Sequence, residues 1–309
     1  MKSLKMVEKG KEEFSFHRPV LLKEAVDLLA PKKGGVYLDG TAGSGGHSEE
    51  ILKRIAPTGR LIAIDIDPFA VKRLEERLLP RYKECCKIVH GNFASFENYL
   101  EKDFLLDGVL LDLGVSADQI FSPERGFSFR FHGPLNMRMD CSENFVSAWT
   151  VVNTYPLEDL VRIFEEYGEE RFGREIAEEI VKRRKKKPIE YTDELAEIVS
   201  KFYRRRGRIH PATKVFQAIR IEVNGEIENL KVFLGKIPYF IKKNGRIVII
   251  SFHSIEDRIV KTQFKAWECY GWGKRILNKP LMPSLQEISE NPRARSAKLR
   301  AFEFYCRNG

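Results

Sequence analysis

The chain has 309 residues, of which 43% are hydrophobic and 31% charged, which is typical of a soluble globular protein of one large domain or two ordinary ones. No apolar run approaches the roughly 20 residues of a membrane span, and residues 1–13 lack the apolar core of a secretory signal. Five cysteines without a Cys-x-x-Cys pair and six scattered histidines predict reduced thiols and no metal site. We therefore expect a cytoplasmic protein with no membrane partner.

The net charge of +9 is concentrated in one segment. Residues 181–210 contain eleven Lys or Arg against four Asp or Glu, a net charge of +7. Such a run is often only a solvated helix face, but beside an enzymatic domain it favours RNA, because phosphate neutralisation supplies most non-specific affinity. The segment could equally serve contacts within a homodimer.

Short apolar runs alternate with amphipathic stretches in the first part of the chain. Strands are predicted at 36–38, 60–64, 86–89 and 107–111, with helices at 46–55 and 68–79. This βαβ alternation predicts a parallel sheet covered on both faces. A loop punctuated by Gly and Pro follows at 121–140, and the later predicted elements are helices at about 144–153, 156–167, 171–187, 191–204 and 211–234 and strands at 246–250 and 301–305.

These elements indicate an α/β fold with a Rossmann-like sheet. The sheet domain is expected to be discontinuous, formed by residues 1–116 and 206–309, with an inserted helical substrate-recognition domain at 117–205. An insertion after the fourth strand lies at the carboxyl ends of the strands, where open α/β sheets bind ligands. The insert is therefore expected to cover the active site.

A glycine-rich turn follows the first strand. Its glycines run Gly43-x-Gly45-Gly46, which differs from the Gly-x-Gly-x-x-Gly spacing of dinucleotide sites. Asp39 lies four residues before Gly43, where a carboxylate suits the cationic end of a methionine moiety and disfavours a pyrophosphate. We interpret the segment from Asp39 to His47 as the S-adenosylmethionine loop of a methyltransferase, with an ordinary tight βα turn as the alternative.

Two further strand ends carry candidate cofactor contacts. Asp65 ends the second strand, where a carboxylate can accept hydrogen bonds from both ribose hydroxyls. Asp67 is the weaker candidate, since it could instead cap the helix that begins at Pro68. Phe93, after the third strand, could stack on the adenine or belong to the core.

The fourth strand ends at Asp112, with Gln119 close behind it. The lone pair of an exocyclic base amine is delocalised into the ring, so acceptors that hold the amino group can aim it at a methyl carbon. Asp112 is the expected acceptor, and a turn-capping role is its alternative.

The chain resembles the MraW/RsmH family, bacterial methyltransferases that act on the N4 amine of a cytidine in 16S ribosomal RNA. The resemblance extends from His17-Arg18-Pro19-Val20-Leu21-Leu22 to Asn291-Pro292-Arg293-Ala294-Arg295-Ser296. The segments that carry it between these ends are Asp39-Gly40-Thr41, Gly45-Gly46-His47, Leu111-Asp112-Leu113-Gly114-Val115-Ser116, Glu124-Arg125-Gly126-Phe127-Ser128-Phe129, Asn136-Met137-Arg138-Met139-Asp140, Tyr167-Gly168-Glu169-Glu170-Arg171-Phe172, His210-Pro211-Ala212-Thr213 and Ser251-Phe252-His253-Ser254. The family commonly has Ser-Ser-Pro-Gln where this chain has Ser116-Ala117-Asp118-Gln119, and Asp where Asn136 stands.

The resemblance implies S-adenosylmethionine as methyl donor and a decoding-centre cytidine of the small ribosomal subunit as substrate. It implies a cofactor site formed by Gly45, Gly46, His47, Asp65, Phe93, Asp112 and Gln119. The pattern also includes His253 at a strand end, where it could contact the base, shuttle a proton or only hold the fold together. Arg125, Phe127, Arg138 and Arg171 could line the RNA path, with structural ion pairing as the alternative.

The expected mechanism is direct methyl transfer to nitrogen. Methylation of ring carbon C5 would need a cysteine nucleophile, which typically follows a proline, and the chain contains no Pro-Cys pair. The target base must be unstacked to reach the pocket. A nicotinamide dehydrogenase, a non-catalytic RNA-binding assembly factor and an N6-adenine methyltransferase remain as rival interpretations.

Overall fold

The computed structural model describes residues 19–102, 104–142, 146–203 and 210–305. His17 and Arg18 of the first family segment, four arginines of the basic run (Arg204, Arg205, Arg206 and Arg208) and Cys306 lie outside the described residues. Within the described ranges, the helices are too short or too polar to cross a membrane.

The sheet has seven strands in the order β3-β2-β1-β4-β5-β7-β6. The strands are β1 (Val36–Asp39), β2 (Arg60–Asp65), β3 (Cys86–His90), β4 (Leu106–Asp112), β5 (Ile241–Ser251), β6 (Gly273–Arg275) and β7 (Lys298–Phe304). The first five pair in parallel, whereas β7 runs antiparallel to both β5 and β6. The strands that follow β1 are added on one side of it as β2 and β3, and then on its other side as β4 and β5. The switch point of the topology therefore lies between β1 and β4, and a ligand site is expected in the crevice at their carboxyl ends. The order confirms the predicted Rossmann-like α/β sheet.

Helices cover both faces of the sheet. One hydrophobic core lies under α1 (Leu22–Leu29), α2 (Gly46–Ile55) and α3 (Pro68–Tyr82). The core of the opposite face lies under α10 (Glu226–Lys236), α11 (Ser254–Cys269) and the 3-10 helix η1 (Phe93–Tyr99). The shorter elements are α4 (Ala117–Phe121), η2 (Pro123–Arg125), η3 (Ile237–Tyr239), α12 (Leu285–Glu290) and η4 (Pro292–Ser296).

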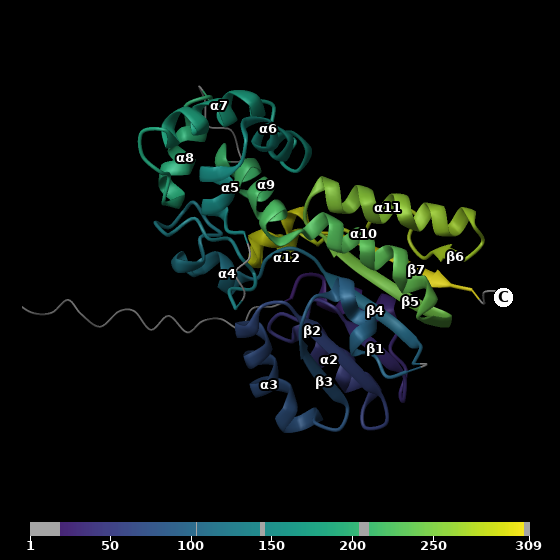
Figure 1. Ribbon diagram of the computed structural model, residues 1–309. Coiled ribbons are helices and arrows are strands. Elements are labelled where there is room, and N and C mark those ends of the chain that lie inside the picture. Colours follow the sequence, from purple (N-terminus) through teal and green to yellow (C-terminus); the bar gives the residue numbers. More distant parts are fainter. Residues whose placement is uncertain (1–18, 103, 143–145, 204–209, 306–309) are drawn as a thin grey trace, which may run out of the picture.

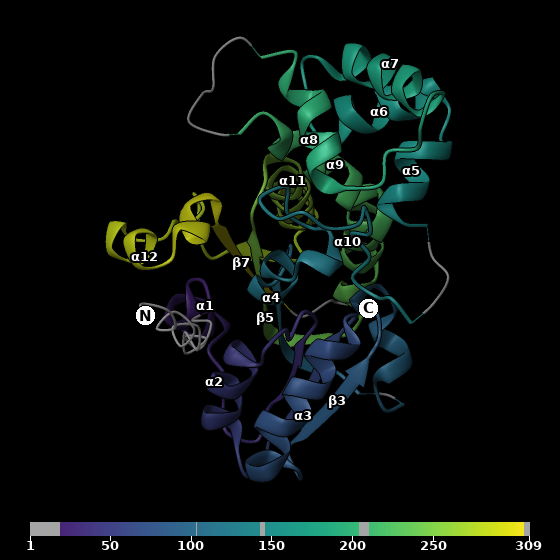
Figure 2. The same ribbon diagram turned by 90° about the vertical axis from the view of Figure 1, so that its left-hand side faces the viewer.

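A separate helical lobe stands beyond the carboxyl ends of the strands (Figures 1 and 2). Its helices are α5 (Ala148–Thr154), α6 (Leu157–Glu166), α7 (Gly173–Arg184), α8 (Thr192–Ser200) and α9 (Ala212–Asn224). These helices share a hydrophobic core of their own, which also takes in Leu135 and Met137 from the preceding loop. The lobe therefore lies over the edge of the sheet at which open α/β folds bind their ligands.

The helix predicted at about 211–234 is two helices. Gly225 has φ 59° and ends α9, and α10 begins at the next residue. A left-handed C-cap is a common way to end a helix, and glycine adopts it without steric cost. Side chains of α9 pack in the core of the lobe, whereas those of α10 pack against the sheet. We propose that the helical domain extends to Asn224, beyond the predicted boundary at 205.

Candidate active site

Four polar side chains end neighbouring strands at the same edge of the sheet. Asp39 ends β1, Asp65 ends β2, His90 ends β3 and Asp112 ends β4. Because these strands are parallel, their carboxyl ends meet beneath the helical lobe (Figure 2). The sheet thus gathers residues that are far apart in the sequence around the switch point between β1 and β4.

The glycine-rich loop bridges this switch point through its backbone. The Gly40 amide donates to the Leu110 carbonyl in β4 at 3.0 Å, and the Ala42 amide donates to the Ile64 carbonyl in β2 at 2.9 Å. Gly45 has φ 84°, and a Cβ there would lie 2.9 Å from a Leu74 methyl group. This position therefore requires glycine for both its conformation and its packing. Gly46 begins α2 and His47 follows it, as expected for a loop that leads into a helix N-terminus.

Two carboxylates hold the loop. Asp65 accepts hydrogen bonds from the amides of Gly43 at 2.7 Å and Asp67 at 2.8 Å. Asp39 accepts one from the Ser48 hydroxyl at 2.6 Å and one from the Thr41 amide at 3.3 Å. Burial raises the pKa of both Asp39 and Asp65 to about 6, although these hydrogen bonds oppose the shift. A nearby positive charge would therefore stabilise the ionised forms of both carboxyl groups.

Asp112 is the most perturbed acid at this edge. Its Oδ1 is buried and has no hydrogen-bond partner among the described residues, and its Oδ2 lies 3.8 Å from Nδ1 of His47. Burial raises the pKa of Asp112 well above its usual value, with further contributions from the charges of Asp39 and Glu256, while Arg293 opposes them. A strongly perturbed carboxyl group with an unpaired oxygen in a ligand crevice marks a functional site.

Asp67 anchors a buried polar network that sequence reasoning did not identify. Its carboxylate accepts from the Gln119 side-chain amide at 2.9 Å and pairs with Arg125 at 3.0 Å, and it also caps α3 through the Phe69 amide. Gln119 in turn forms a capping box with Ser116 at the start of α4. The capping role considered for Asp67 is confirmed. The pairing partners could not be read from the sequence, because Asp67, Gln119 and Arg125 belong to separate elements.

Hydrogen bonds and an ion pair hold the segment from Ser122 to Asp140 over the carboxyl ends of the strands. Arg125 donates to the carbonyls of Arg138 at 3.1 Å and Met139 at 2.8 Å. Asp140 pairs with His90, at the end of β3, at 3.1 Å. Arg125 is buried and committed to Asp67 and these carbonyls, which supports the structural alternative to an RNA contact for this residue.

Phe93 lies next to the start of the glycine-rich loop. A Cβ added to Gly40 would lie 3.0 Å from the Cβ of Phe93. The rings of Phe93 and Phe233 pack edge to face, with 5.6 Å between their centres. One part of the ring therefore belongs to the core. Its contact with the adenine stays a prediction.

His253 caps α11. Its Nδ1 accepts from the Glu256 amide at 3.4 Å, its Nε2 lies 3.0 Å from the Glu256 carboxylate, and its side chain is only 6% exposed. Burial raises the pKa of Glu256, but the hydrogen bond and charge of His253, together with Arg220, outweigh it and leave that pKa below its usual value. This geometry supports a structural role for His253.

Glu226, His253 and Glu256 bring possible metal-ligand atoms within 4.8 Å of one another. However, both carboxylate oxygens of Glu226 accept hydrogen bonds from Arg220, at 2.8 and 2.9 Å. Arg220 therefore already supplies to Glu226 the positive charge that a metal ion would bring. We therefore assign the cluster to the packing between the lobe and the sheet.

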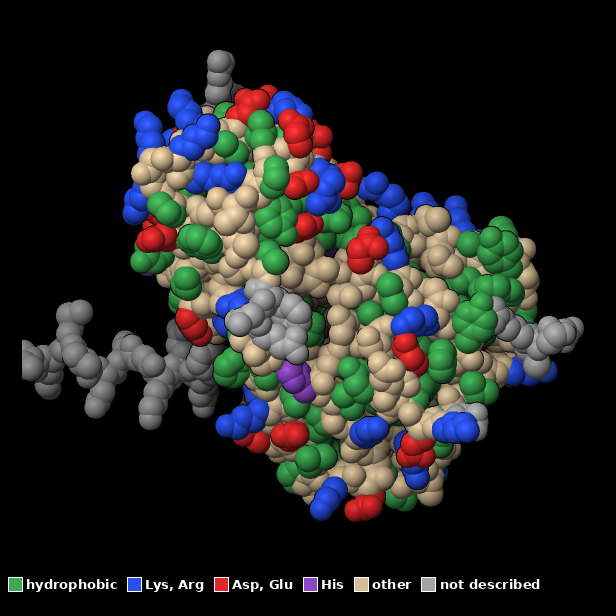
Figure 3. Space-filling model, in the orientation of Figure 1, with side chains coloured by type: hydrophobic (Ala, Val, Ile, Leu, Met, Phe, Trp, Pro, Cys, Tyr) green, Lys and Arg blue, Asp and Glu red, His purple; other side chains and the backbone are tan. Residues whose placement is uncertain are grey.

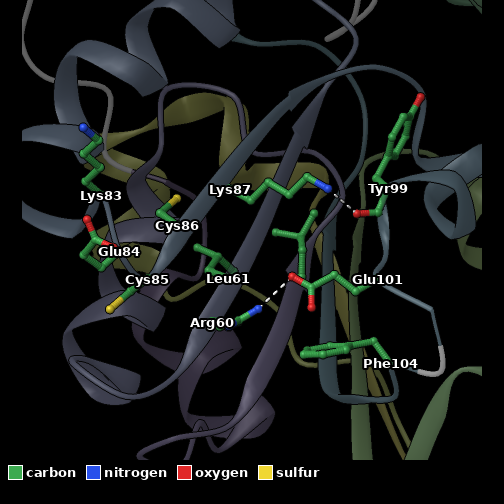
Figure 4. Close-up of a pocket in the computed structure, with 11 residues that line it drawn as sticks. Arg60, Leu61, Lys83, Glu84, Cys85, Cys86, Lys87, Tyr99, Glu101 and Phe104 are labelled. Atoms are coloured by element: carbon green, nitrogen blue, oxygen red, sulfur yellow. Dashed lines mark hydrogen bonds and ion pairs between the residues drawn. The ribbon is translucent and has the colours of Figure 1, made fainter.

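The pocket in Figure 4 lies at the opposite edge of the sheet. It is lined by Arg60 and Leu61 at the start of β2, by Cys85 and Cys86 at the start of β3, and by Phe104 before β4. These positions are at the amino ends of the strands, away from Asp39, Asp65 and Asp112. The pocket is therefore separate from the candidate active site.

The residues at the carboxyl edge fit S-adenosylmethionine. Three carboxyl groups with raised pKa values surround the glycine-rich loop, and a sulfonium compound supplies the positive charge that they lack. A Cβ added to Gly43 would meet only the Thr41 carbonyl oxygen, at 3.9 Å, so this part of the loop backbone is open to a ligand. The fold and the site together define a methyltransferase that uses S-adenosylmethionine.

Comparisons with known proteins identify the family. The model of the MraW methylase family matches residues 14–305, and the chain belongs to this family. Ribosomal RNA small subunit methyltransferase H of Coprothermobacter proteolyticus is 47% identical, covering 93% of this chain and 95% of that protein. The protein of the same name from Carboxydothermus hydrogenoformans is 48% identical, covering 94% and 98%. The crystal structure of an rRNA methylase from Streptococcus thermophilus covers 94% of this chain and 99% of its own, with 10% identity and a TM-score of 0.44.

Proposed function

We propose that the protein transfers a methyl group from S-adenosylmethionine to the N4 amine of a decoding-centre cytidine in 16S ribosomal RNA, on the assembled small subunit. The relatives named above support a ribosomal RNA substrate. The observation that carries the proposed chemistry is the buried, unpaired Oδ1 of Asp112 at the switch point. This oxygen can accept a hydrogen bond from the exocyclic amine of a bound base.

When bound, the cofactor supplies an electrophilic methyl group on a positively charged sulfur. Asp112 accepts a hydrogen bond from the N4 amine and so turns the nitrogen lone pair toward the methyl carbon. As the new N–C bond forms and the S–C bond breaks, positive charge moves to N4. The Asp112 carboxylate stabilises this charge and then takes the amine proton, a step that its raised pKa favours.

The cysteines support transfer to nitrogen over transfer to carbon C5. Cys85 and Cys86 are buried at the opposite edge of the sheet, and Cys141 and Cys269 are exposed. Cys85 and Cys86 therefore lie at the amino ends of the strands, away from Asp112, where a nucleophile for base C6 would be needed.

We propose that the helical lobe binds the RNA. Lys182, Lys185, Lys186 and Lys187 are exposed at and beyond the end of α7, within the predicted basic run. Basic side chains gather on this side of the lobe in Figure 3. A concentration of positive charge above the active site would attract the RNA backbone toward the pocket.

The test is incubation with methyl-labelled S-adenosylmethionine and small subunits that lack the modification, followed by mass spectrometry of nucleosides. Naked 16S RNA serves as the parallel substrate, and Asp112→Asn as the inactive control. We expect N4-methylcytidine from the subunits and much less from naked RNA. Label on adenine N6, on cytosine C5 or on another nucleotide would overturn the substrate, and unchanged activity of Asp112→Asn would overturn the mechanism.

A further inference from the structure

Arg293 reaches the active site from the last part of the chain. It lies in η4, and its guanidinium carbon is 5.9 Å from the centre of the Phe121 ring, in the helix that follows the strand of Asp112. Arg293 is half-buried, yet it makes no hydrogen bond or ion pair with any residue that the structure describes. No nitrogen of Arg293 is among the buried unpaired atoms of the described residues, so its donors reach solvent and are open to a ligand.

The charge of Arg293 acts on the reaction site. Burial lowers the pKa of Arg293, while the carboxylates of Asp118 and Asp112 oppose the shift, and Arg293 in turn lowers the pKa of Asp112. Asp118 already has its own partner, since its carboxylate lies 3.0 Å from Arg73. Asp112 acts on Arg293 through its charge and forms no direct ion pair with it among the described residues, so the donors of Arg293 are open to an anion that enters the mouth of the site.

Phe121 offers a second surface for the same ligand. Its side chain is 53% exposed, and its ring meets Phe131 edge to face at 6.3 Å. An exposed aromatic ring beside an uncommitted guanidinium matches a nucleotide of single-stranded RNA, because bases stack on aromatic rings and guanidinium groups bind phosphate in a bidentate manner.

We propose that Arg293 holds a phosphate of the RNA strand next to the target nucleotide, and that Phe121 stacks on a base beside it. This inference rests on the proposed function and adds the residues that position the strand. Phe121 lies in α4, which follows β4 and Asp112, and Arg293 lies in η4 near the end of the chain, so neither residue belongs to the glycine-rich loop that follows β1. For this reason the phosphate of the substrate is preferred to the carboxylate of the cofactor as the ligand.

The experiment compares Arg293→Ala, Arg293→Lys and Arg295→Ala. Arg295 lies in the same 3-10 helix and is exposed, so its replacement removes an equal charge without touching Phe121. The measurements are kcat/KM for methylation of unmodified small subunits, S-adenosylmethionine affinity by calorimetry, and binding to subunits as a function of salt concentration. Phe121→Ala is measured alongside.

We expect Arg293→Ala to lower kcat/KM about 10- to 100-fold, as loss of a charged hydrogen-bonded contact does. Its salt dependence of binding should weaken by about 0.7 in the logarithmic slope, the contribution of one phosphate contact to a single strand. Arg293→Lys should recover part of the activity, because lysine keeps the charge but not the bidentate geometry. Cofactor affinity should stay within about twofold in all variants, and Arg295→Ala should match wild type.

Several results would overturn the inference. Equal losses in Arg293→Ala and Arg295→Ala would show a general charge effect, and a tenfold loss of cofactor affinity would place Arg293 at the cofactor. If Arg293→Ala melts at a lower temperature, Arg293→Lys decides, and full wild-type activity in that variant would count against a bidentate phosphate contact. A wild-type enzyme that methylates no cytidine N4 would overturn the proposed function instead, whereas an active wild type with an unaffected Arg293→Ala overturns this inference alone.

Discussion

The backbone N–H of Asp112 donates a hydrogen bond to Oγ1 of Thr41 at 2.6 Å. This bond joins the end of the reaction strand β4 to the cofactor loop after β1. The Thr41 amide in turn donates to Asp39. The residue expected to hold the substrate amine is therefore positioned by the loop expected to hold the methyl donor, which fixes the two reactants relative to each other.

Thr41→Val tests this link. Valine has the shape of threonine but offers no acceptor, so the N–H of Asp112 loses its partner. We expect the free energy of unfolding to fall by about 1–2 kcal/mol and methyl transfer to fall by about tenfold or more, because small misplacements of reacting groups are costly. Thr41→Ser keeps the hydroxyl and is the matched control. Urea unfolding and single-turnover methylation measure both effects, and equal activity of the two variants would contradict the role of this bond.

Asp112→Asn separates catalysis from stability. Asparagine keeps the size of the side chain but cannot take a proton, so methyl transfer should fall by about 100-fold or more. The raised pKa of Asp112 means that its ionisation destabilises the folded state, a cost that grows as pH rises above the usual carboxyl pKa of about 3.9. The stability advantage of the variant over wild type should therefore grow as pH rises above about 4, measured by thermal unfolding without cofactor. If the difference in stability between the variant and wild type did not change with pH, ionisation of Asp112 would not destabilise the folded protein.

The binding of S-adenosylmethionine should depend on pH through Asp39 and Asp65. Both have pKa values of about 6 in the cofactor-free protein, and their ionised forms attract a cation. Affinity should therefore rise between pH 5 and pH 7.5, with a midpoint near 6. S-adenosylhomocysteine lacks the sulfonium charge and should show a smaller change in calorimetry. Equal pH dependence of the two ligands would mean that charge attraction at these carboxylates does not drive binding.

His253→Asn distinguishes the two roles considered for His253. Asparagine is a good N-cap residue but cannot shuttle a proton at neutral pH. If His253 serves as the cap of α11, the variant should keep its methylation rate within about threefold, whereas His253→Ala should lose about 1 kcal/mol of stability. A folded His253→Asn protein that has lost methyl transfer about 100-fold would instead assign a proton-transfer role to the side chain.

The amino-acid sequence by itself determined the parallel sheet, the glycine-rich loop and the family, and it predicted the insertion. Each of these leaves a local pattern: alternating apolar runs predict the strands, Gly43-x-Gly45-Gly46 requires close backbone approach, and the change from βαβ units to consecutive helices indicates the inserted domain. Strand ends also predicted Asp65 and Asp112, because the carboxyl ends of parallel strands share one edge.

Only the tertiary structure decided which side chains meet. The pairing of Asp67 with Arg125 and Gln119, the fastening of Asp140 to His90 and the position of Arg293 over Phe121 all join segments that are distant in the chain. The break between α9 and α10 at Gly225 was missed for a related reason, since a single glycine in a helical pattern is tolerated and only the packing of the two halves on different cores requires a turn there. Local propensity and periodicity specify elements, but burial and pairing between elements depend on how they pack in three dimensions.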